Sequence, residues 1–596
     1  MSYNDDIMKH LFFSCTRRLF ASSLALGVCV SSGETLTLDV QEGSQTFSSD
    51  MFADSLNKTG AGEAVVNAPS VVVSGRATSS AGVLKFTGSG TRTFGSLMAD
   101  AGRLVFADAG DVSVDSVFVR SSSASAWLSL AGTTAINGSQ TLQIAASAGT
   151  RGCVFVGDGA RLSFSAFQAG ESGQGHCVVE GGSVAVSGET TLSANGGAAR
   201  IVAAGGSFVS AGTISVAATS STADEETLIA AYDGGVVKST GGDFAVKATF
   251  AHRTVVAACD GGVFGAQHLT KTASAASTLH LGFNGGVLAP TYPYNFFNNL
   301  EPDSLTVYEK GMTIDTSETK NGGNFGAVWL TKPIVGPKGS SIGEIALPTD
   351  APFLAEVYSG PVPVVIAGTG VGAAAVAEYD AETHAITSIR VVCPGTGYDE
   401  ATTASIRSEN GRSTYSCPVT VVAAKNTGSL TKRGGAAYRL YGGNAYGGDT
   451  ICEGGELLLL ADDSLPATSG IICRDGATFN LNGKNGGSFI VPRLGGAGGT
   501  ISGGNVTVTE SLVFDGDEIA AASGPLRMTG SLTLGANVSV RLGRLKSLEP
   551  NVRYEVLRAA GGISGTPLSD RRCKVEVENG SIWLTRRASG LSVLVR

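Results

Sequence analysis

The chain has 596 residues, including 83 Gly, and only 16% of its residues are charged while 42% are hydrophobic. Disordered chains combine low hydrophobicity with high net charge, so this composition predicts a folded chain. The 42 basic and 51 acidic residues give a net charge of −9, which offers no general attraction to nucleic acid or anionic membranes. We therefore expect no nucleic-acid partner.

The first 33 residues have the features of an export signal. Lys9, Arg17 and Arg18 form a basic part, and an apolar core follows from Leu19 to Val30. A membrane-spanning helix needs about 20 apolar residues, so the segment predicts a cleaved signal and no integral membrane segment after cleavage. The paired arginines leave twin-arginine export open as an alternative to ordinary secretion, and Cys29 leaves lipidation open. We expect an extracellular or cell-surface protein.

Between residues 34 and about 148, short segments alternate apolar and polar residues and are separated by Gly, Ser and Asn. This pattern predicts strands of a solenoid or a sandwich. A Gly-centred turn then recurs at intervals of 22, 24, 29, 27 and 24 residues, a period that is typical of solenoid rungs. The middle residues of these turns are Gly159, Gly181, Gly205, Gly234, Gly261 and Gly285.

Two apolar columns flank these turns. Four residues before the middle glycine stand Phe155, Cys177, Ile201, Ala230, Ala257 and Leu281. Three residues after it stand Leu162, Val184, Phe208, Val237, Phe264 and Leu288. Equivalent residues of stacked coils lie one strand spacing apart, about 4.8 Å, so we expect each set to form one buried column.

Residues 289–333 interrupt the repeat with prolines and with the aromatic residues Tyr292, Tyr294, Phe296 and Phe297. This segment is expected to be either a cap over an open end of the coil stack or a surface that stacks on sugars or docks a protein. The partners expected for such a surface are host or environmental glycans, or surface proteins.

Residues 333–425 are the most proline-rich part of the chain. The segments VPVVIAGTGVGAAAVAEYD and AITSIRVVCPGTGYDEA resemble a small β module of bacterial surface proteins and phage structural proteins. The resemblance implies a compact β insertion or a separate domain. It also leaves open a phage-derived fibre, which a trimeric state in solution would favour.

Residues 430–459 alternate with a period of two, which predicts strands. The residues of this motif are Leu430, Lys432, Gly434, Leu440, Gly442, Asn444, Tyr446, Gly448, Thr450 and Leu457. The motif resembles the passenger-associated repeat of bacterial autotransporters, and GATFNLNG at 476–483 looks like the next rung of that family. The resemblance implies a parallel β-helix that is exported and then displayed or released. We expect the translocator barrel of that family to be absent.

Acidic residues precede several of the turn glycines. On adjacent rungs, Asp233 and Asp260 would lie about 5 Å apart, which suits a calcium site or the carboxylate pair of a retaining glycosidase. The simpler interpretation is that Asp before Gly-Gly favours the turn itself. No group of basic residues accompanies them in the sequence, so we expect no catalytic residue and no cofactor, and the pair is only a weak metal candidate. GSSIG around Ser341 matches a nucleophile elbow but lies in a Pro- and Gly-rich loop, where chance explains it better.

Eight cysteines follow the expected signal, and none belongs to a CxxC pair, so a zinc site is not predicted. Three pairs are spaced by about one rung: Cys153 with Cys177, Cys393 with Cys417, and Cys452 with Cys473. Outside the cytoplasm these pairs could form disulfides, and Cys393 with Cys417 is the preferred pair. Cys177 and Cys259 are expected on inward columns, where they could instead be small buried apolar groups.

These observations predict an all-β chain that is mostly a right-handed parallel β-helix. The expected parts are a signal at 1–33, a β-helix at 34–332, a Pro- and Gly-rich β module at 333–425, and a β-helix with closing strands at 426–596. The expected function is that of a non-catalytic structural or adhesive protein at a bacterial surface. The alternative is a carbohydrate-active β-helix, either a polysaccharide lyase or a glycosidase. In that case acidic, basic and aromatic side chains should converge in one groove.

Overall fold

The structure is a computed structural model. It describes residues 28–29 and 34–588, except for 122–124, 221–225, 273–276, 299–300, 322–323, 359, 381 and 409–412. The expected export signal therefore lies outside the described residues, apart from the short strand β1 (Val28–Cys29). The described chain is a parallel β-solenoid of about 20 turns, which confirms the predicted all-β parallel β-helix. None of its described helices combines the length and the apolar character needed to span a membrane.

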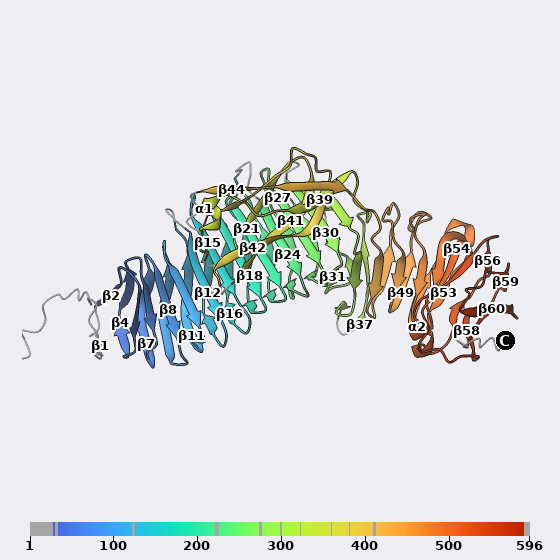
Figure 1. The fold of residues 1–596 in the computed structure, drawn as a ribbon, viewed down its shortest axis with the longest axis horizontal. Coiled ribbons are helices and arrows are strands. Elements are labelled where there is room, and N and C mark those ends of the chain that lie inside the picture. The colour runs from blue at the N-terminus through green and yellow to red at the C-terminus, as the bar shows by residue number, and fades with distance from the viewer. Residues whose placement is uncertain are drawn as a thin grey trace, which may run out of the picture.

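The solenoid is an elongated, arched rod with the two ends of the described chain at its opposite ends (Figure 1). A typical turn of the N-terminal half contains β18 (Gln174–Glu180), β19 (Ser183–Val186) and β20 (Thr190–Leu192). β18 belongs to a twelve-stranded sheet of the described chain, sheet B, while β19 and β20 belong to the larger sheet A. In the C-terminal part, sheet A is instead paired with a ten-stranded sheet C.

Sheets B and C each place one strand in every turn that they cover. In order along the rod, sheet B consists of β3 (Ser44–Phe47), β6 (Glu63–Val66), β8 (Val83–Thr87), β10 (Arg103–Ala107), β12 (Ala126–Ala131), β15 (Arg151–Val156), β18, β21 (Ala198–Ala204), β24 (Glu226–Tyr232), β27 (Arg253–Cys259), β30 (Thr278–Asn284) and β34 (Ser304–Val307). Sheet C consists of β32 (Tyr294–Asn295), β38 (Ala327–Leu330), β47 (Ala437–Leu440), β49 (Gly455–Leu459), β51 (Ala477–Asn480), β53 (Thr500–Ser502), β55 (Leu526–Met528), β58 (Arg553–Ala559), β61 (Ser581–Arg586) and β60 (Cys573–Glu578).

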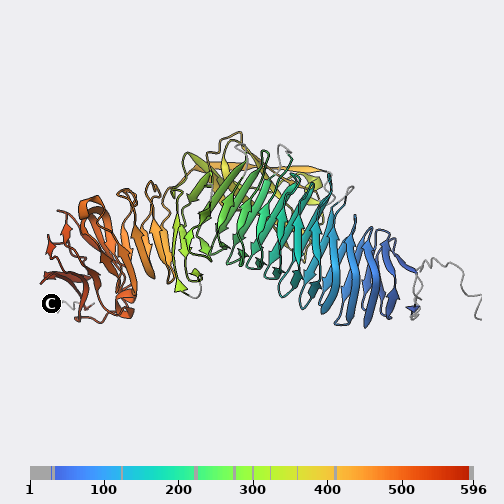
Figure 2. The same ribbon diagram turned by 180° about the vertical axis from the view of Figure 1, so that it is seen from behind.

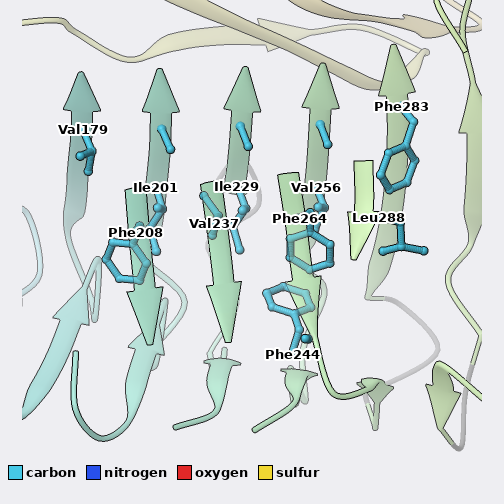
Figure 3. Close-up of a cluster of buried hydrophobic side chains, with 14 of the residues drawn as sticks. Val179, Ile201, Phe208, Ile229, Val237, Phe244, Val256, Phe264, Phe283 and Leu288 are labelled. Atoms are coloured by element: carbon cyan, nitrogen blue, oxygen red, sulfur yellow. The ribbon is translucent and has the colours of Figure 1, made fainter. Parts of the chain in front are cut away.

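The predicted apolar column after the turns is present. The register joins Leu162, Val184, Phe208, Val237, Phe264 and Leu288 as consecutive partners in parallel strands of sheet A. All six side chains are buried in the main core. Figure 3 shows part of this core, with Phe208, Val237, Phe264 and Leu288 facing the inward side chains of sheet B. Like residues therefore stack over like residues, as the repeat predicts.

The predicted column before the turns is wrong for three of its six members. Cys177, Ile201 and Leu281 face the core, but Phe155, Ala230 and Ala257 face outward and join a separate cluster. The register shows why, because it pairs Ala230 with Val202 and not with Ile201. The turns that contain an Asp before the glycine are one residue longer, and a shift of one residue moves a strand position to the opposite face. Asp233 and Asp260 absorb the extra residue with φ of 53° and 48°, in the left-handed region that Asp tolerates.

The segment between β38 and β46 (Leu430–Arg433) is an insertion in a continuous rod, because β46 pairs in parallel with β35 (Met312–Asp315). It contains α1 (Ala351–Leu354) and the strands β39 (Ser340–Ile345), β40 (Val364–Ala367), β41 (Val371–Asp380), β42 (Ala385–Thr396), β43 (Thr403–Arg407), β44 (Thr414–Cys417) and β45 (Val419–Ala423). These strands pair antiparallel with one another. We call this segment the inserted module.

The inserted module folds back along the outer face of sheet B, over β15 to β30, as Figures 1 and 2 show from two sides. Strands β41 and β42 contact β27 and β30 directly. The covered strands are apolar on both faces, so that Val202, Leu228 and Val255 are buried beneath the module. A sheet that is covered on both faces has continuous apolar strands, whereas a sheet with one wet face alternates.

The last strands of the rod change direction. β58 and β61 pair antiparallel, as do β60 and β61, so the parallel stack ends in a small meander. A parallel stack leaves a row of unpaired backbone groups at its end, and such an edge invites pairing with other chains. The meander covers the last parallel strand of sheet C.

Replacing Phe208 with Ala should destabilise the rod, because its ring is fully buried and lies 5.0 Å from that of Phe167. The expected loss is about 3 to 5 kcal/mol of unfolding free energy, measured by urea denaturation. Phe52→Ala is the matched control, since Phe52 is 39% exposed, and it should change stability by less than about 0.5 kcal/mol. Equal effects of the two substitutions would contradict the stacked core.

Candidate functional site

Four rings and one guanidinium form a continuous surface track where sheet C begins. The ring of Tyr292 lies 5.4 Å from that of His268 and 6.0 Å from that of Tyr294, which in turn lies 6.1 Å from that of Trp329. The guanidinium of Arg439 lies 5.3 Å from the centre of the Trp329 ring. These separations are those of favourable aromatic and cation–π pairs, so each group supports its neighbour. We call these five residues the aromatic patch.

Adjacent strands of sheet C hold one end of the patch. Trp329 of β38 pairs with Arg439 of β47, and both side chains lie on the outer face, because their neighbours Val328 and Tyr438 fill the core. Trp329 also pairs with Asn295 of β32 on its other side. The strand register therefore fixes the order of the groups at this end of the patch.

Tyr294 is the most exposed member, with 53% of its surface accessible. Its register partner Val328 is fully buried, so a regular strand would direct Tyr294 into the core. Instead Tyr294 has a φ of 90°, which is strained for a residue with a side chain. Backbone strain of this kind persists only where the surrounding structure imposes it. The local fold thus turns a large aromatic ring outward against its conformational preference.

Only half of the aromatic run expected at this surface contributes to it. Phe296 and Phe297 are buried in the main core, and Phe297 pairs with Leu269 in sheet A. Tyr292 and Tyr294 remain at the surface, where Trp329 and Arg439 join them from later strands. The expectation of a four-residue aromatic surface is therefore corrected to two tyrosines plus groups that the sequence did not indicate.

Polar groups lie at both ends of the patch. His268 Nδ1 is 3.0 Å from Asp243 Oδ1, so a carboxylate fixes the imidazole at one end. Arg439 supplies hydrogen-bond donors at the other end, where its side chain is exposed. The patch therefore offers flat apolar faces between a carboxylate–imidazole pair and a guanidinium.

The two carboxylates that the sequence suggested for a metal or a glycosidase lie together but are already paired. Arg390 of the inserted module donates hydrogen bonds to Asp233 Oδ1 at 2.7 Å and to Asp260 Oδ2 at 2.9 Å, and also to Asp233 Oδ2. Lys310 forms a second ion pair with Asp260. The sequence suggested that no basic residues accompany these carboxylates, and that prediction is wrong. Lys310 is 50 residues from Asp260 in the sequence, and Arg390 is 130 residues from Asp260 and 157 from Asp233.

The electrostatics of this Arg390 cluster favour a fixed ion pair. Burial opposes ionisation of Asp260, but hydrogen bonds from Lys310 and Arg390 outweigh it and hold the pKa of that carboxyl below its usual value. The guanidinium also lies 5.0 Å from the centre of the Tyr232 ring. Within the described ranges, no three His, Cys, Asp or Glu side chains are grouped so that they could hold a metal ion. The geometry is that of a contact that attaches the module to the rod.

Three histidines that lie in or beside strands of sheet B are buried and carry no charge at neutral pH. Burial lowers the pKa of His252 and of His280 to about 4. Burial, and then the positive charge of Arg200, lowers the pKa of His176 to about 3. His252 Nε2 lies 2.8 Å from Thr227 Oγ1, and His280 Nδ1 lies 2.9 Å from Ser304 Oγ. These histidines therefore pack in the fold as neutral imidazoles, and their burial disfavours the protonated form.

The structure separates two of the three cysteine pairs that spacing suggested. No disulfide joins any of the eight cysteines from Cys153 to Cys573 in the structure. Of the two cysteines expected on inward columns, Cys177 faces the core, whereas Cys259 faces outward into the cluster beneath the module. The residue opposite Cys177 is Val154, so Cys153 and Cys177 face opposite sides of sheet B. Cys393 and Cys417 belong to different buried clusters. Cys452 and Cys473 are register partners inside the core.

The motif at 430–459 has structural roles throughout. Lys432 is fully buried, and its Nζ donates to Gly434 O at 2.6 Å and to Gly454 O at 2.5 Å, so it ties two successive turns together. Burial lowers its pKa to about 8. Lys58 donates in the same way to Thr59 O and Gly60 O, within a second LxKxG sequence at 56–60.

The polar residues of the motif join neighbouring turns. Asn444 donates to Ser464 O at 2.8 Å and accepts from Ile334 N at 2.8 Å. The buried hydroxyl group of Thr450 lies 2.5 Å from that of Tyr446 in the same turn and 2.8 Å from that of Ser469 in the next turn. Buried polar groups are costly unless they are paired, so these contacts fix the register of adjacent rungs.

Replacing Arg390 with Met should loosen the inserted module without unfolding the rod, because it removes three hydrogen bonds to Asp233 and Asp260. Amide hydrogen exchange in β41 and β42 should become at least about tenfold faster, the equivalent of about 1.4 kcal/mol. Arg541→Met, on the sheet A strand β57 (Ser539–Leu542), is the matched control and should leave exchange in the module unchanged. Unaltered exchange in the Arg390 variant would contradict the assigned attachment.

Acid should destabilise the protein between pH 6.5 and pH 4. The unfolded chain protonates its histidines near pH 6.5, whereas folded His252 and His280 resist protonation until about pH 4, so the unfolded state binds more protons in this window. The free energy of unfolding must therefore fall as pH falls, by on the order of 3 kcal/mol per histidine over the whole window. Urea midpoints across this range measure the effect.

His252→Gln should remove about half of this pH dependence, and His252→Gln combined with His280→Gln should remove most of it. Stabilisation by the paired Asp260 and Asp303 carboxylates, whose folded pKa values are lowered, is lost only at more acidic pH, below about pH 4. A midpoint that stays constant from pH 6.5 to pH 4 would show that these imidazoles are not held neutral.

No family model matches this chain, and neither a curated protein nor a solved structure matches it. The likeness of residues 430–459 to the autotransporter passenger-associated repeat therefore remains a resemblance of one motif. The geometry of the aromatic patch is left as the main guide to function.

Proposed function

We propose that this chain is a non-catalytic, exported β-solenoid that binds glycans through the aromatic patch and so acts as an adhesive or structural protein at a bacterial surface. The observation that carries the proposal is the exposed ring of Tyr294, which is held outward by a strained backbone beside Trp329. An outward ring held by a strained backbone does not improve the packing of the core. It does leave the face of the ring accessible for stacking on a ligand.

The chemistry of the patch suits a neutral pyranose. The axial C–H groups of a pyranose form a flat apolar face that stacks on an aromatic ring, while its hydroxyl groups seek hydrogen bonds at the edges. Tyr292, Tyr294 and Trp329 provide the apolar faces, and the His268–Asp243 pair and Arg439 provide polar groups at the ends. Because the rings follow one another at about 6 Å, a chain of sugars fits better than a single one.

The rest of the molecule is consistent with a rod that displays the aromatic patch outside the cell. The rod is expected to be stiff, because the strands of each turn are hydrogen-bonded to those of the next turn. The apolar segment at Leu19–Val30 and the resemblance at 430–459 both favour export. Export would place the patch where environmental glycans are present.

Binding should be measured by calorimetry with cellohexaose, xylohexaose and N-acetylchitohexaose as probes. Tyr294→Ala and Trp329→Ala should each weaken the binding of the preferred probe at least tenfold, because large aromatic anchors dominate such contacts. Phe250→Ala is the matched control, since Phe250 is 49% exposed outside the patch, and it should bind like the unaltered protein. Failure of all three probes to bind, or equal binding by all variants, would overturn the glycan proposal.

The same samples distinguish a carbohydrate-active enzyme. A glycosidase needs one carboxyl in its acid form, and burial, together with Glu378, raises the pKa of Glu180 near the inserted module. Release of new reducing ends or of unsaturated products from the bound probe would favour that alternative. A probe that is recovered intact after long incubation supports the non-catalytic assignment.

A further inference from the structure

Two cysteines from distant parts of the chain meet where the inserted module lies on the rod. Cys259 is the last residue of β27 in sheet B, and Cys393 lies in β42 of the module. Both side chains are fully buried and belong to the same buried cluster, and Cys393 lies close enough to add to the effect of burial in raising the pKa of the Cys259 thiol. The two residues are 134 positions apart, so sequence spacing gives no indication of the pair.

The surface of the rod is shaped to receive the Cys393 sulfur. Gly282 of β30 lies directly beneath it, and a Cβ atom at residue 282 would approach Sγ to 2.6 Å. Any larger residue there would displace the sulfur. The ring of Tyr308 lines the same site, because its Cε2 atom would lie 3.1 Å from a Cβ atom at residue 282. The sulfur therefore occupies a defined position beside Cys259.

We propose that Cys259 and Cys393 form a disulfide when the chain folds in an oxidising compartment, which fastens the inserted module covalently to the solenoid. The oxidant is a small-molecule disulfide such as oxidised glutathione. One cysteine thiolate attacks it and releases one thiol, giving a mixed disulfide. The second cysteine thiolate then displaces the other thiol, so two protein thiols lose two protons and two electrons as one external disulfide is reduced.

The surroundings favour this pair over those that spacing suggested. Cys153 and Cys177 face opposite sides of a sheet, and Cys417 lies in another cluster than Cys393. Burial raises the pKa of Cys259, so its thiol reacts slowly once the module is in place. The bond therefore forms as the module docks, and the solvent-inaccessible product resists later reduction.

Peptide mapping of the refolded chain tests the proposal. The full chain is reduced, unfolded and refolded with a mixture of oxidised and reduced glutathione, then alkylated and digested with trypsin without reduction. Cleavage after Arg253, Lys271, Arg390 and Arg407 releases residues 254–271 and 391–407, each with a single cysteine. Mass spectrometry should find these two peptides joined, and reduction should separate them.

Variants and a second readout keep the result interpretable. Cys393→Ser should abolish the joined peptide and should accelerate hydrogen exchange in β41 and β42 at least tenfold relative to the oxidised protein, whereas the matched control Cys417→Ser should retain the joined peptide. If the oxidised, folded chain yields both peptides singly alkylated, the proposal is overturned. It is equally overturned if 391–407 is joined to the Cys417 peptide, 413–425. Neither outcome depends on glycan binding.

Discussion

Parallel register is the constraint on which the whole molecule depends. Residues of adjacent rungs must lie one strand spacing apart, so every coil has to return its chain to the same position whatever its length. The intervals of 22 to 29 residues show that coil length varies, and the variation is absorbed in the turns. At the longer turns, Asp233 and Asp260 adopt left-handed backbone angles ahead of the glycine. A requirement of the turn thereby places two carboxylates side by side at the surface, where Arg390 binds them.

The second requirement is that sheet B be covered on both faces. Its middle strands carry apolar residues outward as well as inward, and a rod with that face exposed would present a large apolar surface. The inserted module supplies the cover from the same chain. The contacts along this interface are of different kinds: the apolar cluster, the Arg390 ion pairs and the sulfur pair of Cys259 and Cys393. Together they explain why small residues such as Gly282 and Ala257 lie beneath the module, where bulkier ones would hold it away.

The fold was largely predictable from the sequence, and the site was not. The column from Leu162 to Leu288 could be predicted because the chain leaves each turn at a constant distance from its glycine. The column before the turns could not, because an added turn residue reverses the face of Ala230 while leaving the spacing plausible. The near-continuous apolar runs around Val202, Leu228 and Val255 were a usable signal of a doubly covered sheet. The LxKxG sequence at 56–60, which matches the one at 430–434, was likewise a usable signal that Lys58 is buried.

The functional groups were harder to predict, for a topological reason. Trp329 and Arg439 are separated in sequence by the whole inserted module, yet they are partners in adjacent strands. No spacing rule relates residues on either side of an insertion of unknown path. The exposure of Tyr294 depends on one backbone angle, which residue type alone does not reveal. Phe296 and Phe297, two and three positions farther along, are also aromatic but lie in the core.

A plain solenoid is close to a one-dimensional array, in which each rung senses only its immediate neighbours and the ends can fray independently. The inserted module breaks that rule, since a single folded unit rests on strands from β15 to β30 at once. The module thereby couples the stability of these rungs to one another. The middle of the rod is then expected to unfold as one cooperative block instead of rung by rung. Bending or pulling forces that reach this block are shared among several coils, whereas on either side of the module each rung transmits them only to its immediate neighbours.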